Sequence, residues 1–565
     1  AINSTDANGT VAVGYAALAA LTEGVANIAI GNNAGNEIST GDNNTVIGFE
    51  AGSELKDDLN NTFLGAYAGY MVESNENTFI GVEAGEGSSG NTTGAQNTSV
   101  GYRSMEAYTT ANKNVAVGGS ALQLNTTGAG NVHLGFRAGQ YNTVGSNMVV
   151  IGAEAGRYAT GSNNTFVGGN AGKGGTTSAP YSSGGSNTAV GYAAFDAFTT
   201  AENTTALGYQ AGSAITSGNS NTTIGYQSSL SLTIGAANVT IGYAAGDAMT
   251  GTSSTVLIGA NAGTAINSTD ANGTIAIGYE AGASITSGQE AVLVGYLAGH
   301  KLTTGDSDTA IGYKALGGDQ TGALTGNSNT AVGRHAMSKA FDSATKNTSM
   351  GNQSLESLTN GGHNTAFGAY AGDNLTTGAY NTYLGYNILV ESATENYTTR
   401  IGDHGVIKYK TARMNITKAH SGDNTVVAQV CKIPALSIIH RVTATVITKS
   451  NLGTYILNLS LSTTDGSAAD AALANASTTI TVPEILGAGG VATYAQNSAT
   501  VLGTAADIVA SSGATNKTVY TAQPTTTIVG TADTFLYICN AGTGNGTTDS
   551  ANVVIDIVVE YQGTD

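Results

Sequence analysis

Apolar and polar residues alternate in a short string that recurs along most of the chain. The string is a β-branched residue, any residue, an apolar residue and then glycine, and it occurs 23 times between residues 11 and 402, mostly at intervals of 17 residues. Thr45 to Gly48 and Thr62 to Gly65 are two copies. Such alternation predicts a β-strand. A fixed period predicts a solenoid in which each coil contributes one strand and no coil can bury its apolar face alone.

The two flanking positions of each strand are expected to face the inside of the coil, because both are β-branched or apolar in all 23 copies. The middle position would then face outward, and a strand in contact with water should be polar there. It is instead usually small or apolar. We therefore expect another copy of the chain to cover it, with interface residues at Val46, Phe63, Phe79, Val150, Phe166 and Leu293.

The positions around the strand also have physical interpretations. Asn stands four residues before the glycine in 15 of the 23 copies, where stacked side-chain amides can form a hydrogen-bonded ladder between coils. The glycine suits a corner where a Cβ would clash. Tyr or Phe follows it in 12 copies, and Ala or Ser comes two residues later in nearly every copy.

The repeat ends at Gly402, and the later sequence has a different pattern. Residues 403–424 contain a local basic cluster and are expected to form a neck or linker. Residues 425–565 contain about eight longer apolar strands with prolines between them, which predicts an antiparallel β-sandwich or jelly roll that forms a terminal knob. Cys431 and Cys539 both lie in this part; they could pair, or they could remain two buried thiols.

Composition and charge exclude several classes of protein. The chain has 79 glycines, no tryptophan and a net charge of −19, which argues against binding to nucleic acid or to an anionic membrane. No apolar run is long enough for a transmembrane helix, so membrane insertion is not expected. We expect no cofactor and no enzymatic activity, because no nucleophile, phosphate-binding or paired-carboxylate motif stands apart from the repeat.

Two features are candidates for binding. His133 takes the middle strand position assigned to the interface, so three copies could meet there around an anion or a metal ion, although a plain stacked histidine is the alternative. Three connections are longer than the others, and such insertions often form the binding face of a solenoid. The longest, residues 173–186, contains Lys173, Pro180 and Tyr181. The alternative is a neutral surface loop.

The string Asn-Thr/Ser-x-Ile/Val-Gly-x-x-Ala, seen at residues 27–34, 77–84 and 187–194, resembles the head repeat of trimeric autotransporter adhesins of the YadA-like type. Similar repeats occur in bacteriophage tail fibres. The resemblance covers residues 9–402 and implies a left-handed parallel β-roll, three of which associate about a common axis.

The sequence departs from the adhesins, because its repeat is longer and nothing after the repeat resembles their coiled-coil stalk or membrane anchor. A knob after a shaft is more typical of a virion fibre, so we expect a homotrimeric fibre of a virus or phage, at the virion or extracellular surface, that contacts a host receptor, a glycan or other virion proteins. A bacterial surface adhesin and a self-assembling extracellular filament are the alternatives.

Overall fold

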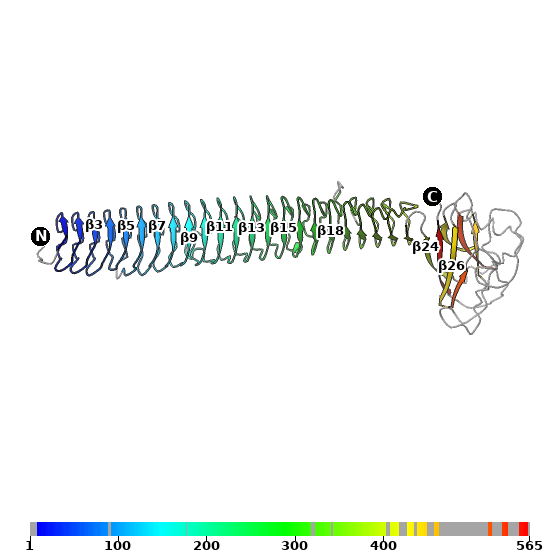
Figure 1. Cartoon of the computed structure of the whole chain (residues 1–565), viewed down its shortest axis with the longest axis horizontal. Coiled ribbons are helices and arrows are strands. Elements are labelled where there is room, and N and C mark those ends of the chain that lie inside the picture. The colour runs from blue at the N-terminus through cyan, green and yellow to red at the C-terminus, as the bar shows by residue number, and fades with distance from the viewer. Residues whose placement is uncertain are drawn as a thin grey trace. The chain divides into compact units, whose positions relative to one another are not determined.

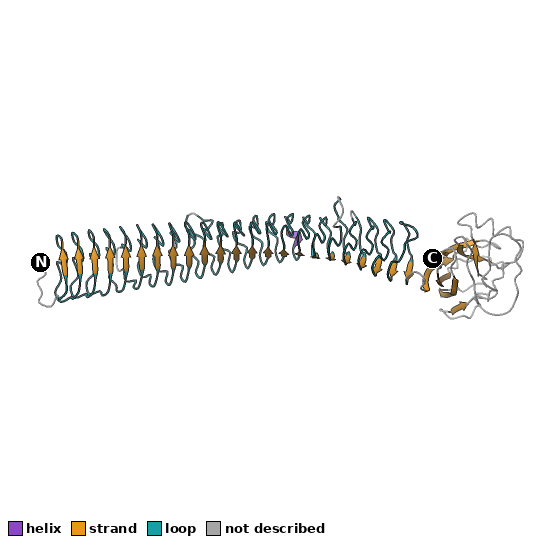
Figure 2. Cartoon of the chain, turned by 45° about the horizontal axis from the view of Figure 1, so that its top comes forward, coloured by secondary structure: helices purple, strands orange, loops and turns teal. Residues whose placement is uncertain are grey.

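The structure is a computed structural model that describes residues 8–88, 92–176, 178–317, 322–340 and 343–402, together with the backbone of seven strands after residue 402. The chain divides into two compact units, residues 1–328 and residues 329–565. The described residues are almost entirely strand and turn, with one short 3-10 helix, η1, at Thr269–Ala271 (Figure 2).

The first unit is a parallel β-solenoid, as the period predicts (Figure 1). Each coil contributes one strand of three residues, and successive strands pair in register, so that Thr45, Val46 and Ile47 lie beside Thr62, Phe63 and Leu64 of the next coil. At about 4.8 Å for each pairing, the 18 strands of this unit make a stack about 80 Å long. The strands are β1 Val11–Val13, β2 Ile28–Ile30, β3 Thr45–Ile47, β4 Thr62–Leu64, β5 Thr78–Ile80, β6 Thr98–Val100, β7 Val115–Val117, β8 Val132–Leu134, β9 Val149–Ile151, β10 Thr165–Val167, β11 Thr188–Val190, β12 Thr205–Leu207, β13 Thr222–Ile224, β14 Val239–Ile241, β15 Val256–Ile258, β16 Ile275–Ile277, β17 Val292–Val294 and β18 Thr309–Ile311.

The structure reverses the predicted assignment of the two strand faces. The middle residue is the one that points into the coil, and the two flanking residues face outward and are partly or fully exposed. The coil is narrow, so a three-residue strand can turn only one side chain into it. The six residues predicted to form a subunit interface are all completely buried inside a single chain, and that prediction is wrong for Val46, Phe63, Phe79, Val150, Phe166 and Leu293.

In many coils, a large side chain in the core comes from one of two positions. One is the middle strand residue, and the other lies six residues later. Where the strand supplies a large side chain such as Phe63, the later position is glycine, and a Cβ on Gly69 would come closer than 3.0 Å to the Phe63 ring. Where the later position is large, as at Leu122, the strand residue is small, as at Ala116. Where both positions are small, as at Ala29 and Gly35, the buried Ile38 side chain, nine residues after Ala29, lies beside the glycine instead.

The glycine after each strand is required by close stacking of the backbone. Gly48 has φ +143, a conformation that other residues rarely adopt, and a Cβ there would lie closer than 3.0 Å to the carbonyl oxygen of Gly65 in the next coil. The predicted corner role of this glycine is confirmed.

The predicted asparagine ladder is present, and its amides are fully used. The Nδ2 of Asn44 donates to the Oδ1 of Asn27, 3.2 Å away, and to the carbonyl oxygen of Asp58, 2.7 Å away. Its Oδ1 accepts from the backbone N–H and the Nδ2 of Asn61, at 3.0 and 3.1 Å. These asparagines are buried, and each one satisfies polar groups that would otherwise be costly inside the coil. Where the ladder position is Thr204, its hydroxyl still accepts from the backbone of Asn221 at 3.4 Å.

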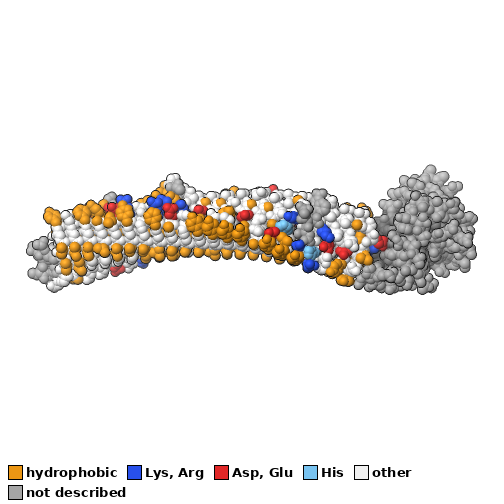
Figure 3. All heavy atoms as spheres, turned by 90° about the horizontal axis from the view of Figure 1, so that it is seen from above, with side chains coloured by type: hydrophobic (Ala, Val, Ile, Leu, Met, Phe, Trp, Pro, Cys, Tyr) orange, Lys and Arg blue, Asp and Glu red, His pale blue; other side chains and the backbone are white. Residues whose placement is uncertain are grey.

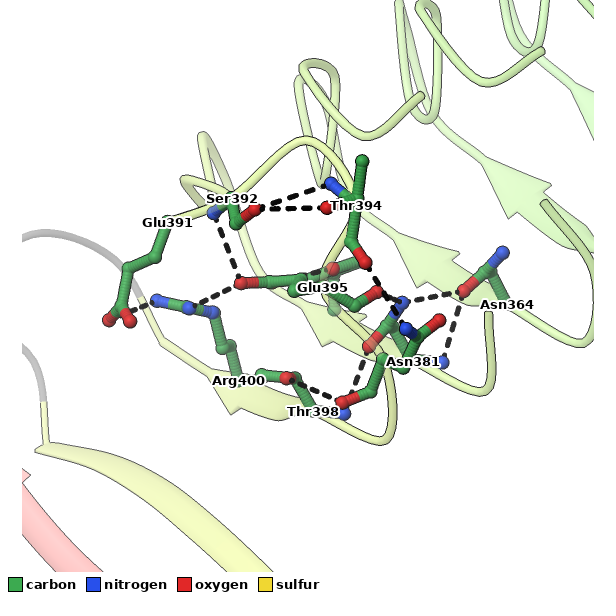
Figure 4. A network of polar contacts seen from close by, with 10 residues as sticks. Asn364, Asn381, Glu391, Ser392, Thr394, Glu395, Thr398 and Arg400 are labelled. Carbon is green, nitrogen blue, oxygen red and sulfur yellow. Dashed lines mark hydrogen bonds and ion pairs between the residues drawn. The ribbon is translucent and has the colours of Figure 1, made fainter. Parts of the chain in front are cut away.

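The second unit begins with five more strands of the same kind. They are β19 Thr330–Val332, β20 Thr348–Met350, β21 Thr365–Phe367, β22 Thr382–Leu384 and β23 Thr399–Ile401. Strand β23 places Arg400 at the inward position, where it pairs with Glu391 and Glu395 at 2.9 Å each (Figure 4). The Tyr383 hydroxyl donates to Glu395 at 2.7 Å. A paired charge thus replaces the apolar side chain of other coils and makes the core of this coil polar.

After residue 402 the strands are longer and antiparallel. They are β24 Ile407–Ile416, β25 Val426–Ile433, β26 Ile438–Thr448, β27 Leu457–Ser462, β28 Thr518–Ala522, β29 Thr534–Asn540 and β30 Val553–Gln562. They form two sheets, β24-β30-β26-β28 and β25-β29-β27. Strand β24 lies in the predicted linker 403–424 and pairs with β30, so the linker prediction does not hold for Ile407–Ile416. Of the roughly eight strands that the sequence predicts in residues 425–565, two, expected at residues 478–482 and 526–529, lie outside the described residues.

The strand register separates the two cysteines. Cys539 in β29 lies opposite Val426, and Cys431 in β25 lies opposite Leu536. The two are therefore offset by three residues or more along the strands.

The shared core space predicts a compensating pair of substitutions. Phe63→Ala alone should cost about 3–5 kcal/mol of unfolding free energy through the cavity it leaves. Gly69→Leu alone should cost at least about 1–3 kcal/mol through overpacking. The double variant reproduces the Ala116 and Leu122 arrangement, so it should lose much less than the sum, as measured by thermal unfolding followed by circular dichroism. Gly65→Ala is the control, because its clash is with the Gly81 backbone and Phe63→Ala should not relieve it.

The asparagine ladder predicts that different substitutions of Asn44 destabilise the solenoid to different degrees. Asn44→Leu removes both donors and the acceptor and should destabilise the solenoid by about 2–4 kcal/mol, because neighbouring buried groups lose their partners. Asn44→Thr keeps an acceptor, as at Thr204, and should cost less in the same unfolding measurement. Equal losses for the two variants would contradict the hydrogen-bonding role.

Candidate interaction surfaces

The outward side of the sheet carries many exposed apolar side chains, and we call it the outer sheet face. It consists of the first and third residues of each strand and the residue after the corner glycine. Of the 31 exposed large hydrophobic side chains in the described residues, 25 occupy these positions. Scattered exposed hydrophobic residues are normal, whereas a concentration on one face marks an interaction site. Rows of hydrophobic side chains are visible along the surface in Figure 3.

Aromatic rings form ladders along one margin of this face. Tyr192, Tyr209, Tyr226 and Tyr243 stack in sequence with ring centroids 5.2 to 5.6 Å apart. Tyr279, Tyr296 and Tyr313 form a second ladder with spacings of 5.2 and 5.3 Å. These rings remain 42 to 57% exposed, so one chain leaves much of their surface uncovered.

His133 lies inside the coil and not on the outer sheet face. Its side chain is completely buried, and neither ring nitrogen makes a hydrogen bond of normal geometry. Burial lowers the pKa of His133 to about 4, although the Ala138 backbone opposes this shift. The prediction that three copies meet at His133 around an ion is wrong, because the ring faces the core of its own chain.

One group of acidic side chains in the described residues has the spacing of a metal site. Carboxylate oxygens of Glu83, Glu86 and Glu106 lie within 4.8 Å of one another. The Arg103 side chain pairs with Glu83, and its Nε lies 3.8 Å from Glu106. Burial, and then Glu83 and Glu106, raise the pKa of Glu86. The arginine already balances part of the charge, so the geometry fits an ion-paired cluster better than a cation site.

The long connection after Lys173 is held against neighbouring coils. The ring of Tyr181 lies 5.1 Å from that of Tyr141 and 6.2 Å from that of Tyr158, measured between centroids. The Nζ of Lys173 lies 3.1 Å from Glu154. Pro180 is exposed at the outer part of the connection. Lys173 and Tyr181 therefore belong to one cluster with residues of two earlier coils, a grouping that the sequence spacing alone did not show.

No protein-family profile, curated protein sequence or solved structure matches the chain. Among the described residues, no helix has the length and hydropathy needed to span a membrane.

The buried histidine predicts a local dependence of stability on pH. An unfolded histidine has a pKa of about 6.5, whereas that of folded His133 is about 4. Between these values the unfolded chain binds the proton and the folded chain does not, so stability should fall as pH drops from 6.5 to 4. The loss should reach about 3 kcal/mol, from the size of the shift.

The measurement is thermal unfolding at pH 7 and pH 4.5. His133→Leu keeps an apolar side chain of the kind found at Leu293, and it should lose less stability than the unmodified chain on acidification. His363→Asn removes an exposed histidine and is the control, because it should follow the unmodified chain. An unchanged pH dependence in His133→Leu would contradict the role of burial.

Proposed function

We propose that the chain is the subunit of a homotrimeric fibre of a virus or phage particle that attaches the particle to a host surface. The outer sheet face is the observation that carries this proposal. It supports assembly of copies along their length, because a single chain leaves its rows of apolar side chains in water. The resemblance of the repeat to trimeric adhesin heads supports three copies and a left-handed coil.

A second copy of the same chain is the partner that fits this face best. Its side chains recur at the coil spacing, about 4.8 Å, and only a surface with the same spacing can match them over many coils. The six residues first assigned to the interface cannot serve, since they fill the core. We assign the interface between copies instead to the flanking strand residues and the aromatic ladders.

The uniform solenoid suits a spacer that holds its ends apart and repeats its binding surfaces. Two antiparallel sheets follow the repeat, and they support a terminal knob in which the sheets pack as a sandwich. This combination favours a virion fibre. A bacterial surface adhesin or a self-assembling extracellular filament would use the same outer sheet face, and copurification with particles, with cell envelopes or as open-ended polymers would separate the three.

The test is the solution mass of the full chain by light scattering, with negative-stain imaging of the same fraction. We expect about three times 56.3 kDa and an elongated particle. The double variant Val149→Glu and Ile151→Glu, on the outer sheet face, should reduce the mass toward one chain while the coil stays folded, because both residues are more than one third exposed.

Val144→Glu provides the matched control. It makes the same chemical change at a valine that is 56% exposed in an outer connection, away from the outer sheet face, and it should leave the assembly intact. A monomeric unmodified chain, or equal effects of the two variants, would overturn assembly through the outer sheet face.

A further inference from the structure

Basic side chains gather in one stretch of an otherwise acidic chain. Residues 107–195 contain four Lys or Arg and one carboxylate, Glu154, although the whole chain has a net charge of −19. Three of the four, Arg137, Arg157 and Lys173, converge on Glu154, and Figure 3 shows Lys and Arg side chains clustered on this part of the surface.

Two carboxylates, Glu154 and Asp196 of the next coil, face the three cations, which leaves an excess of one positive charge. Glu154 Oε1 lies 3.1 Å from Arg157 and 3.7 Å from Arg137, and its Oε2 lies 3.1 Å from Lys173. Partial burial acts to raise the pKa of Glu154, but these three cations outweigh it and lower that pKa. Asp196 of the next coil is also close to Lys173, and burial raises the pKa of its carboxyl.

Three tyrosines border the same cations. The rings of Tyr141 and Tyr158 stack at 5.0 Å, and Tyr181 from the long connection lies against both. The guanidinium of Arg157 lies 5.0 Å from the centroid of Tyr158 and 5.8 Å from that of Tyr141. Cation–π contacts of this kind orient the guanidinium before any ligand arrives. We call the set Arg137, Tyr141, Glu154, Arg157, Lys173 and Tyr181 the basic–aromatic patch.

The long connection is fixed in place by hydrogen bonds to its neighbours. The Ser182 carbonyl accepts from the backbone N–H of Thr160 at 2.8 Å, and the Ser182 N–H donates to the Tyr158 carbonyl at 3.0 Å. Gly174 donates to Asp196 in the following coil at 2.9 Å. Tyr181 is thus presented by an anchored segment, which lowers the entropy cost of binding.

We propose that the basic–aromatic patch binds an acidic polysaccharide, a chain of sugars that carry carboxylates. Arginine and lysine recognise carboxylates through charge-assisted hydrogen bonds, and aromatic rings offer flat apolar faces to the C–H faces of sugar rings. One cation on each of successive coils matches a polymer with one charge on each sugar unit. Nucleic acid fits less well, since its binding requires many phosphate contacts and the rest of the chain is acidic.

This inference rests on the proposed function, because it names the ligand of an attachment fibre. The patch lies within one chain. Its residues belong to turns that come after the strands of the outer sheet face along the chain. Three copies in one fibre would present three patches, and multivalent contact with a long polysaccharide would raise the overall affinity.

The experiment titrates the full chain with polygalacturonate and with neutral dextran of similar length, at 50 and 200 mM salt, by isothermal titration calorimetry. We expect binding of polygalacturonate that weakens with salt, and no comparable binding of dextran. Lys173→Gln and Tyr181→Ala should each weaken it about tenfold, the effect of losing one contact to a charged group or one stacked ring. Lys113→Gln removes the same charge from an exposed turn of the same stretch and should stay within about twofold, because it loses no such contact.

Binding of dextran as strong as that of polygalacturonate would overturn the charge requirement. An effect of Lys113→Gln equal to that of Lys173→Gln would show that only net charge matters, and no binding of polygalacturonate would overturn the proposal outright. Light scattering on the same samples keeps the two proposals distinct. A trimer that does not bind polygalacturonate would contradict the patch proposal but not the fibre proposal. A monomer that binds it would contradict the fibre proposal but not the patch proposal.

Discussion

The close, in-register stacking of coil on coil is the constraint on which the rest of the structure depends. Each strand has only three residues and makes few contacts within its own coil, so its backbone groups must be satisfied by the coils on either side. Stacking at this distance requires a glycine at every corner, as at Gly48 against Gly65, and it aligns identical positions in columns. The asparagine ladder, the tyrosine ladders and the outer sheet face are all columns of this kind.

The same stacking explains how the core is filled. In many coils the large side chain comes either from the strand, as at Phe63, or from the turn six residues later, as at Leu122 beside Ala116. Where both positions are small, as at Ala29 and Gly35, a residue nine positions after the middle strand residue lies there instead, such as Ile38. Arg400 ends the series, because a charge paired with Glu391 and Glu395 makes the last coil core polar.

Two surfaces follow from this arrangement, and they differ in kind. The outer sheet face is regular and apolar and extends along the repeat, which suits contact with another regular array. The basic–aromatic patch is local and depends on an irregular connection that brings Tyr181 against Tyr141 and Tyr158. In the proposed fibre, the outer sheet face would serve assembly and the basic–aromatic patch would serve recognition. The charge of the patch is opposite to that of the chain as a whole, which separates it from the solvating acidic surface.

The sequence by itself determined the period, the parallel strands, the corner glycines and the asparagine ladder, because each of these depends on which residues recur and stacking makes recurrence visible. It did not determine which strand face is inside, since both faces carry apolar residues. Two features of the sequence indicate that the middle position faces inward. Thr occupies the first strand position in 14 of 23 copies. Large middle residues in β1–β18 are always followed six residues later by glycine. Only the tertiary structure placed Phe63 and His133 in the core and brought Lys173 and Tyr181 to Glu154 and Tyr141. Those contacts join residues of different coils through side chains whose direction depends on the width of the coil, and the order of residues along the chain does not record that width.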